Sequence, residues 1–96
     1  MKLDRKFTGT ITKVKDGSVV PDDQYVVFLA KDNAFPAALA AYVKECERIG
    51  ASAEQVTSAR ALQKRVAQWR HEHPELCKTP DVGFAEFKRL MQEVPS

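Results

Sequence analysis

The chain has 96 residues, of which 44% are hydrophobic and 29% are charged, and its formal net charge is +2 at pH 7. This length predicts a single domain over residues 1–96, near the lower limit of chains that bury a self-sufficient core, and the composition excludes a disordered chain. The charge is milder than the clustered excess of nucleic-acid-binding domains, so binding to DNA or RNA is not expected. No apolar run approaches the roughly 20 residues that span a bilayer, so a membrane is not an expected partner.

The N-terminal segment and the cysteines indicate a compartment. Residues 1–6 carry charges where a signal peptide needs an apolar stretch, which predicts a cytosolic protein. In such a reducing compartment a disulfide between Cys46 and Cys77 is not expected. Cys46 falls on the predicted inner stripe of a helix, so we interpret it as a small buried apolar residue.

Residues 6–30 are predicted to form an antiparallel sheet of two or three strands. Residues 6–15 alternate between two faces and include several threonines, a pattern that suits a half-exposed strand. Asp16-Gly17 is a strong hairpin signal, because a type I′ turn needs positive φ at both central positions. Residues 18–20 then form the short return strand.

The third strand of this sheet is predicted over residues 24–30. The segment is nearly continuously apolar. Such a run is typical of a central strand with both faces covered, and Pro21 separates it from the hairpin by ending the return strand.

Residues 33–73 are predicted to form an antiparallel helical hairpin, around which the chain is organised. Apolar residues recur in steps of three and four, which places each set on one side of a helix. The first set is Phe35, Leu39, Tyr42, Cys46 and Ile49, and the second is Val56, Ala59, Leu62, Val66 and Trp69. A turn at Gly50-Ala51 is short enough for the two stripes to cover each other.

Helix-end signals set the bounds of this hairpin. Asp32 and Asn33 both suit the N-cap of the first helix. Ser52 and Gln55 have the spacing of a capping box, in which each side chain satisfies an orphan N–H group of the other residue. Pro74 stops the second helix.

A short third helix is predicted over residues 82–92. Its apolar face needs cover from the parent domain or from a neighbouring chain, and we assign Phe84, Phe87 and Met91 to an interface. With the unpaired edge of the sheet, this face predicts a homo-oligomer, a dimer or larger. The fold class is therefore α+β: a small two- or three-stranded antiparallel sheet followed by an antiparallel helical hairpin and a short C-terminal helix.

The first candidate binding site is the start of the first helix. A first helical turn offers unpaired N–H groups and the positive end of the dipole, which suit phosphate or carboxylate. We assign Lys31 and Asn33 to this anion site. The alternative is a capped helix with a solvated lysine. No glycine-rich cradle accompanies the site, so a P-loop or Rossmann site is rejected.

The second candidate is a basic stripe on the outer face of the second helix. Arg60, Lys64 and His71 follow one face of this helix. Such a stripe suits phosphate groups, and the arginine fork favours bidentate recognition. A solvated helix face is the alternative.

Metal binding and catalysis are not expected. His71, His73 and Cys77 resemble half a zinc site, but a structural zinc needs four ligands, and histidines two residues apart on a helix point in different directions. A polar helix terminus is the simpler interpretation. The chain has no Gly-x-Ser-x-Gly or His-Glu-x-x-His motif, so we predict no catalytic residue, no metal and no cofactor.

Several short stretches follow one another in a recognisable order between residues 7 and 81. They are Phe7-Thr8-Gly9-Thr10-Ile11, then Val20-Pro21-Asp22-Asp23 leading into Val27-Phe28-Leu29-Ala30-Lys31-Asp32, and finally His73-Pro74 through Lys78-Thr79-Pro80-Asp81. This succession resembles small proteins of tailed bacteriophages and prophages. It is also similar to part of the phage anti-Thoeris sponge family, whose members sequester cyclic ADP-ribose-type signals.

The resemblance implies an antiparallel sheet followed by helices, an oligomer, and a nucleotide pocket between chains. The family's ligand contacts do not match this sequence residue by residue, so none is transferred to it. Lys31, Arg60 and Lys64 are assigned by the helix arguments alone, and the segment from Phe84 to Met91 lies outside the resemblance.

Together these features predict a non-enzymatic phage accessory protein of the host cytosol that neutralises a host defence by binding a phosphorylated, cyclic nucleotide signal. The alternative is a protein–protein inhibitor or adaptor, similar to an anti-CRISPR protein, that docks on a host defence complex. Its docking surface is the face of Phe84, Phe87 and Met91, or the polar side of the hairpin. A small structural or regulatory phage domain is the third interpretation.

Overall fold

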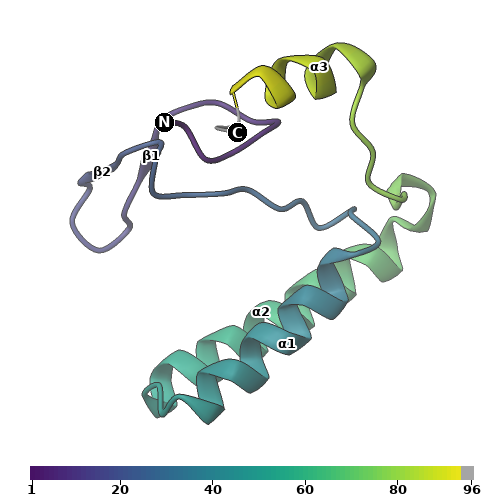
Figure 1. Cartoon of the computed structure of the whole chain (residues 1–96). Helices are drawn as coiled ribbons and strands as arrows, with labels where there is room; N and C mark the ends of the chain where they lie inside the picture. The colour runs from purple at the N-terminus through teal and green to yellow at the C-terminus, as the bar shows by residue number, and fades with distance from the viewer. Residues whose placement is uncertain (94–96) are drawn as a thin grey trace. The chain divides into compact units, whose positions relative to one another are not determined.

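The computed structural model describes residues 1–93 and shows the predicted α+β class, with a two-stranded sheet, a helical hairpin and a short C-terminal helix (Figure 1). Although one domain was predicted over residues 1–96, the chain divides into two compact units. One unit comprises residues 1–27 together with the segment from Asp81 onwards, and the other comprises residues 28–80.

The sheet of the first unit is an antiparallel hairpin. Strands β1 (Ile11–Thr12) and β2 (Val19–Val20) pair with Ile11 opposite Val20 and Thr12 opposite Val19. The predicted hairpin is therefore confirmed. Its first strand is much shorter than the ten-residue alternation suggested, because these side chains are largely exposed and pack against no second layer.

The hairpin turn differs from the predicted type I′ turn. The N–H of Lys13 donates to the carbonyl of Ser18 over 2.9 Å, which closes a longer loop. Gly17 has φ 74°, whereas no non-glycine residue within 1–93 has positive φ, so Asp16 does not adopt the conformation that type I′ requires. Instead the Asp16 carboxylate accepts hydrogen bonds from the hydroxyl of Ser18 over 2.6 Å and from its N–H over 2.9 Å.

The predicted third strand over residues 24–30 is wrong. This segment is extended but joins no sheet, and Val26 and Phe28 are each 55% exposed. Within this segment, the N–H of Val27 donates to the carboxylate of Asp4 over 2.6 Å rather than to a neighbouring strand. The Asp4 side chain thus takes the place of the neighbouring strand that the apolar run predicted.

Asp4 holds the start of the chain to this extended segment. The carboxylate is buried and accepts hydrogen bonds from the N–H groups of Lys6 (2.9 Å), Phe7 (2.6 Å) and Val27 (2.6 Å). Burial by itself would raise the pKa of Asp4, but the three backbone donors and the charge of Lys2 outweigh it and leave the pKa below its ordinary value.

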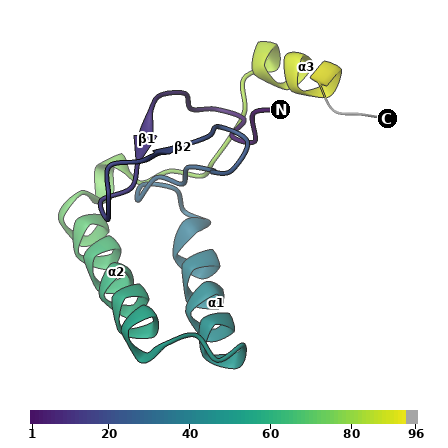
Figure 2. The same ribbon diagram turned by 90° about the vertical axis from the view of Figure 1, so that its left-hand side faces the viewer.

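The second unit contains the predicted hairpin. Helices α1 (Phe35–Arg48) and α2 (Ala53–Glu72) run side by side and antiparallel in both views (Figures 1 and 2). Gly50 lies between them with φ 75°, the left-handed conformation predicted for it. The buried apolar residues of the pair are Leu39, Val43, Cys46, Ala59 and Val66. Of the predicted stripes, Tyr42, Ile49 and Leu62 are exposed, and Val43 is buried in place of Tyr42.

The ends of the two helices follow the sequence signals in part. The Ser52 hydroxyl caps α2 by accepting from the N–H of Gln55 over 3.1 Å. The other hydrogen bond of the predicted capping box, between the Gln55 side chain and the N–H of Ser52, does not form. The Gln55 amide donates to the Tyr42 hydroxyl instead. The predicted N-caps of α1 are wrong: its N-cap is Ala34, which has no side-chain cap.

The open end of the hairpin is closed by backbone hydrogen bonds. Asp32 and Lys78 form an isolated parallel bridge, in which the N–H of Asn33 donates to Lys78 and the N–H of Lys78 donates to Lys31, both over 2.9 Å. A short 3-10 helix, η1 (Pro74–Leu76), leads from α2 to this bridge. The segments before α1 and after α2 are therefore fixed to each other.

Helix α3 (Phe84–Glu93) belongs to the first unit. It begins at Phe84, later than the predicted residue 82. The Lys6 ammonium donates to the Asp81 carbonyl and so links the segment before α3 to the N-terminal segment of the same unit.

Candidate functional site

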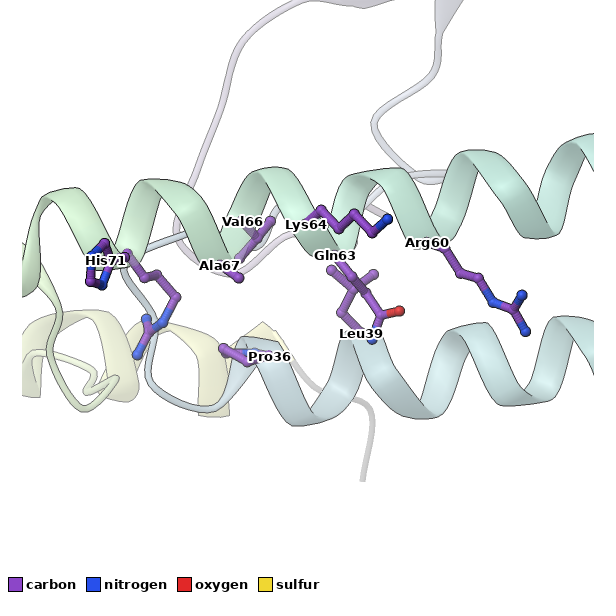
Figure 3. A pocket seen from close by; sticks show the side chains of 9 residues that line it. Pro36, Leu39, Arg60, Gln63, Lys64, Val66, Ala67 and His71 are labelled. Carbon is purple, nitrogen blue, oxygen red and sulfur yellow. The ribbon is translucent and has the colours of Figure 1, made fainter.

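A groove of about 770 Å³ follows one side of the α1–α2 hairpin (Figure 3). Residues of α1 and α2 line it: Pro36, Leu39, Arg60, Gln63, Lys64, Val66, Ala67, Arg70 and His71. Leu39 and Val66 are buried between the helices and form an apolar floor. The basic side chains of the second predicted site, Arg60, Lys64 and His71, are therefore brought together on a single surface.

Helical spacing explains why these side chains share the groove. Arg60, Lys64 and His71 are separated by four and seven residues, which returns each to the same face of α2. Arg60 and His71 lie near the two ends of the groove, with Lys64 between them (Figure 3). At a rise of about 1.5 Å per residue, the three positions are spread over about 16 Å.

The charges in the groove are unequally satisfied. The Arg60 guanidinium extends from α2 toward α1 (Figure 3) and forms an ion pair with the Glu47 carboxylate. Within residues 1–93, Lys64 and His71 form no hydrogen bond or ion pair, and both are exposed. Lys64 and His71 are thus available to an anion, and Arg60 is held by a solvated ion pair that an anion can replace.

Arg70 also lines the groove, but both of its terminal nitrogens donate to groups at the start of the hairpin. Its guanidinium donates to the carbonyls of Ala30 (3.0 Å) and Asp32 (3.2 Å) and to the Asn33 side-chain oxygen (2.9 Å). Arg70 therefore fixes the start of the hairpin against α2. The sequence gives no sign of these contacts, because nothing local to Arg70 indicates partners about forty residues away.

The first predicted anion site has a different setting. Lys31 and Asn33 do not line the groove, and the Asn33 side chain accepts from Arg70. At the start of α1, the N–H of Ala34 donates to the Asp32 carboxylate over 2.7 Å, and Pro36 has no N–H. A carboxylate already occupies the position where an anion was expected, so we place the candidate site in the groove.

The predicted interface residues of α3 are exposed. Phe84 is 82% exposed, Phe87 49% and Met91 58%. These side chains form an apolar face that the described part of the chain leaves uncovered.

The possible metal ligands do not converge. Among residues 1–93, no group of three or more His, Cys, Asp or Glu side chains is arranged to hold a metal ion. The His73 ring stacks on Trp69 with centroids 4.6 Å apart, and its Nδ1 lies 2.8 Å from the Trp69 carbonyl. The Cys77 thiol donates to the His73 carbonyl over 3.5 Å. His73 and Cys77 thus complete the end of α2, in agreement with a polar helix terminus.

No protein family, curated protein or solved structure matches this chain. The resemblance to the phage sponge family stays a prediction. In the part of the chain that the structure describes, no helix has both the length and the apolar character needed to cross a bilayer.

Proposed function

We propose that this chain is a non-enzymatic binding protein that holds a phosphorylated nucleotide in the groove between α1 and α2. The observation that carries the proposal is the row of Arg60, Lys64 and His71 along one groove whose floor is formed by Leu39 and Val66. Cationic side chains beside an apolar surface suit a ligand that has both phosphates and a flat ring.

The spacing of Arg60, Lys64 and His71 favours a ligand with more than one phosphate. Arg60 and Lys64 are separated by about 6 Å along α2, and Lys64 and His71 by about 10 Å. A single phosphate contacts the nearer pair alone, whereas a nucleotide with separated phosphates reaches all three. Gln63, which also lines the groove, adds an amide that can donate to or accept from a base.

For the biological role, we propose a phage accessory protein of the host cytosol that neutralises a host defence by sequestering its signal. The support for this role is the ordered resemblance over residues 7–81 and the lack of a catalytic motif in the sequence. A sponge needs binding without turnover, and a groove lined by basic side chains supports the binding part of this role.

Titration calorimetry of the full chain tests the proposal. The panel contains cyclic ADP-ribose isomers, cyclic oligonucleotides and inorganic phosphate. We expect one of the nucleotides to bind more tightly than phosphate and to be recovered chemically unchanged by chromatography. No heat from any nucleotide, with a sample whose circular dichroism shows folded helices, would contradict the proposal.

A second candidate function is that of an adaptor or inhibitor that docks on a host defence protein. The exposed apolar face of Phe84, Phe87 and Met91 favours it, because such faces are typical of interfaces. Affinity capture from host lysate tests this candidate. It predicts a stoichiometric protein partner that Phe87→Glu releases, while the groove variant Lys64→Glu retains it. A sponge recovers no stoichiometric protein.

A further inference from the structure

The apolar stripes of α1 and α2 have the seven-residue period of helical bundles. On α1, Phe35, Tyr42 and Ile49 are seven residues apart, with Leu39 and Cys46 between them. On α2 the same alternation of three- and four-residue steps gives the series Ala59, Leu62, Val66 and Trp69. In a bundle, both sets of positions in such a stripe face neighbouring helices.

The hairpin buries only one of these two sets. Leu39 and Val66 are 5% and 7% exposed, because they lie on the line of contact between the helices. Tyr42, Ile49 and Leu62 are 52%, 64% and 38% exposed. The helix α1 is rotated so that Val43 takes the place of Tyr42 in the contact, which leaves this set largely uncovered. Phe35 and Trp69 of the same set are half-buried, because they stack on Phe28 and His73.

The three exposed residues of this set lie on one face of the hairpin, which we call the bundle face: Tyr42, Ile49 and Leu62. The Gln55 amide donates to the Tyr42 hydroxyl over 3.1 Å, so the sides of α1 and α2 that carry these two residues meet. Leu62 follows Gln55 by seven residues and lies on the same side of α2. Lys64 projects to the other side, so the bundle face lies opposite the groove.

Charge shows which face accepts a second copy of this chain. The groove carries Arg60, Lys64 and Arg70 against the carboxylate of Glu47, so two grooves repel each other. The bundle face is bordered by charges of both signs: Glu45 and Arg48 on α1, and Arg65 and Glu72 on α2. Two copies can therefore pair through this face without strong electrostatic repulsion.

Side-chain size on the same side favours close packing. Next to the exposed apolar residues are small side chains that allow helices to approach closely: Ala38, Ala41, Ser58 and Ala61. A second hairpin supplies the same two half-covered stripes, so a twofold arrangement covers both at once. We propose that two copies of this chain pair through the bundle face and form an antiparallel four-helix bundle.

This pairing does not depend on the ligand. Because the bundle face and the groove are on opposite sides of the hairpin, each copy keeps its groove open in the dimer. Failure of nucleotide binding therefore leaves this inference standing, and failure of pairing leaves the proposed function standing.

Light scattering of the full chain over a concentration series tests the inference. We expect a mass of twice 10.8 kDa for the unmodified chain. Leu62→Glu places a charge in the bundle face and is expected to weaken pairing at least about 100-fold, which gives the monomer mass. The matched control is Lys44→Glu, which changes an exposed residue of α1 outside the face and leaves the mass doubled.

Three results would overturn the inference. The first is a mass of 10.8 kDa for the unmodified chain at every concentration. The second is dissociation by Phe87→Glu with no effect of Leu62→Glu, which would place the contact on α3. The third is a doubled mass for Ile49→Glu, a charge introduced into the bundle face itself. This variant should stay folded, as circular dichroism can check, because Ile49 is an exposed residue at the C-terminal end of α1.

Discussion

Arg60 of α2 forms an ion pair with Glu47 of α1 and so bridges the two helices beside the groove. Both side chains are about half exposed, at 59% and 45%, so solvent weakens the attraction. The pair contributes little to the stability of the hairpin, but it decides how much of the guanidinium is available to a bound anion. Glu47 is in this sense a competitor of the proposed ligand.

Glu47→Gln is therefore expected to tighten nucleotide binding. An exposed ion pair is worth up to about 1 kcal/mol, so the affinity should rise by about two- to fivefold. Titration calorimetry at low ionic strength measures the change. The matched control is Glu45→Gln, which removes the same charge from the pair with Arg48 on the other side of α1 and should leave affinity unchanged. Equal effects of both variants on affinity would indicate that the net charge of the chain, and not competition by Glu47 for Arg60, controls binding.

Arg70→Ala is expected to destabilise the hairpin by about 2 kcal/mol, because the carbonyls of Ala30 and Asp32 lose a charged donor. Urea unfolding followed by circular dichroism measures this change. Arg70→Lys should rescue only part of the stability, since an ammonium lacks the planar fork that reaches two carbonyls and the Asn33 oxygen together. An unchanged free energy of unfolding in Arg70→Ala would show that the hydrogen bonds of Arg70 do not stabilise the hairpin.

Gly50→Ala is expected to cost about 1–2 kcal/mol of stability. Gly50 has φ 75°, a left-handed conformation in which a Cβ is strained, although no atom lies within 4 Å of that position. The cost therefore comes from backbone conformation and not from a clash. Gly50→Asn should cost less, because asparagine tolerates this conformation better. Thermal unfolding of the two variants measures the difference, and equal loss in both would contradict the explanation.

Asp4 predicts a pH dependence of the first unit. Its pKa is lower in the folded chain than the ordinary 3.8, so the ionised carboxylate stabilises the fold above that pH. This contribution is lost as the pH falls through the lowered pKa. Amide hydrogen exchange at Val27 reports it, because that N–H donates to Asp4. Protection should fall in acid, and Asp4→Asn should lose protection already at neutral pH and show no further acid dependence from this site.

The sequence predicted the hairpin because its signals are local. Gly50, Ser52 and Pro74 each fix a helix end through backbone geometry or a hydrogen bond to a near neighbour. The basic stripe was predictable for the same reason, since the spacing of Arg60, Lys64 and His71 alone puts them on one face.

The features that escaped prediction depend on distant partners. The segment over residues 24–30 has the composition of a strand, but its N–H partner is Asp4, which no sequence pattern identifies. Arg70 has no local sign of its contacts with Ala30 and Asp32. The burial of Val43 in place of Tyr42 is a small rotation of α1, set by where α2 packs and not by the period of the stripe.

The central claim is that the groove between α1 and α2 binds a phosphorylated nucleotide, and one pair of variants tests it most directly. Lys64→Glu and Arg65→Glu make the same charge change at adjacent residues, but only Lys64 lines the groove. Calorimetry with the best nucleotide of the panel should show loss of at least about tenfold in affinity for Lys64→Glu and near-unchanged affinity for Arg65→Glu. Equal affinities for the two variants would contradict the account.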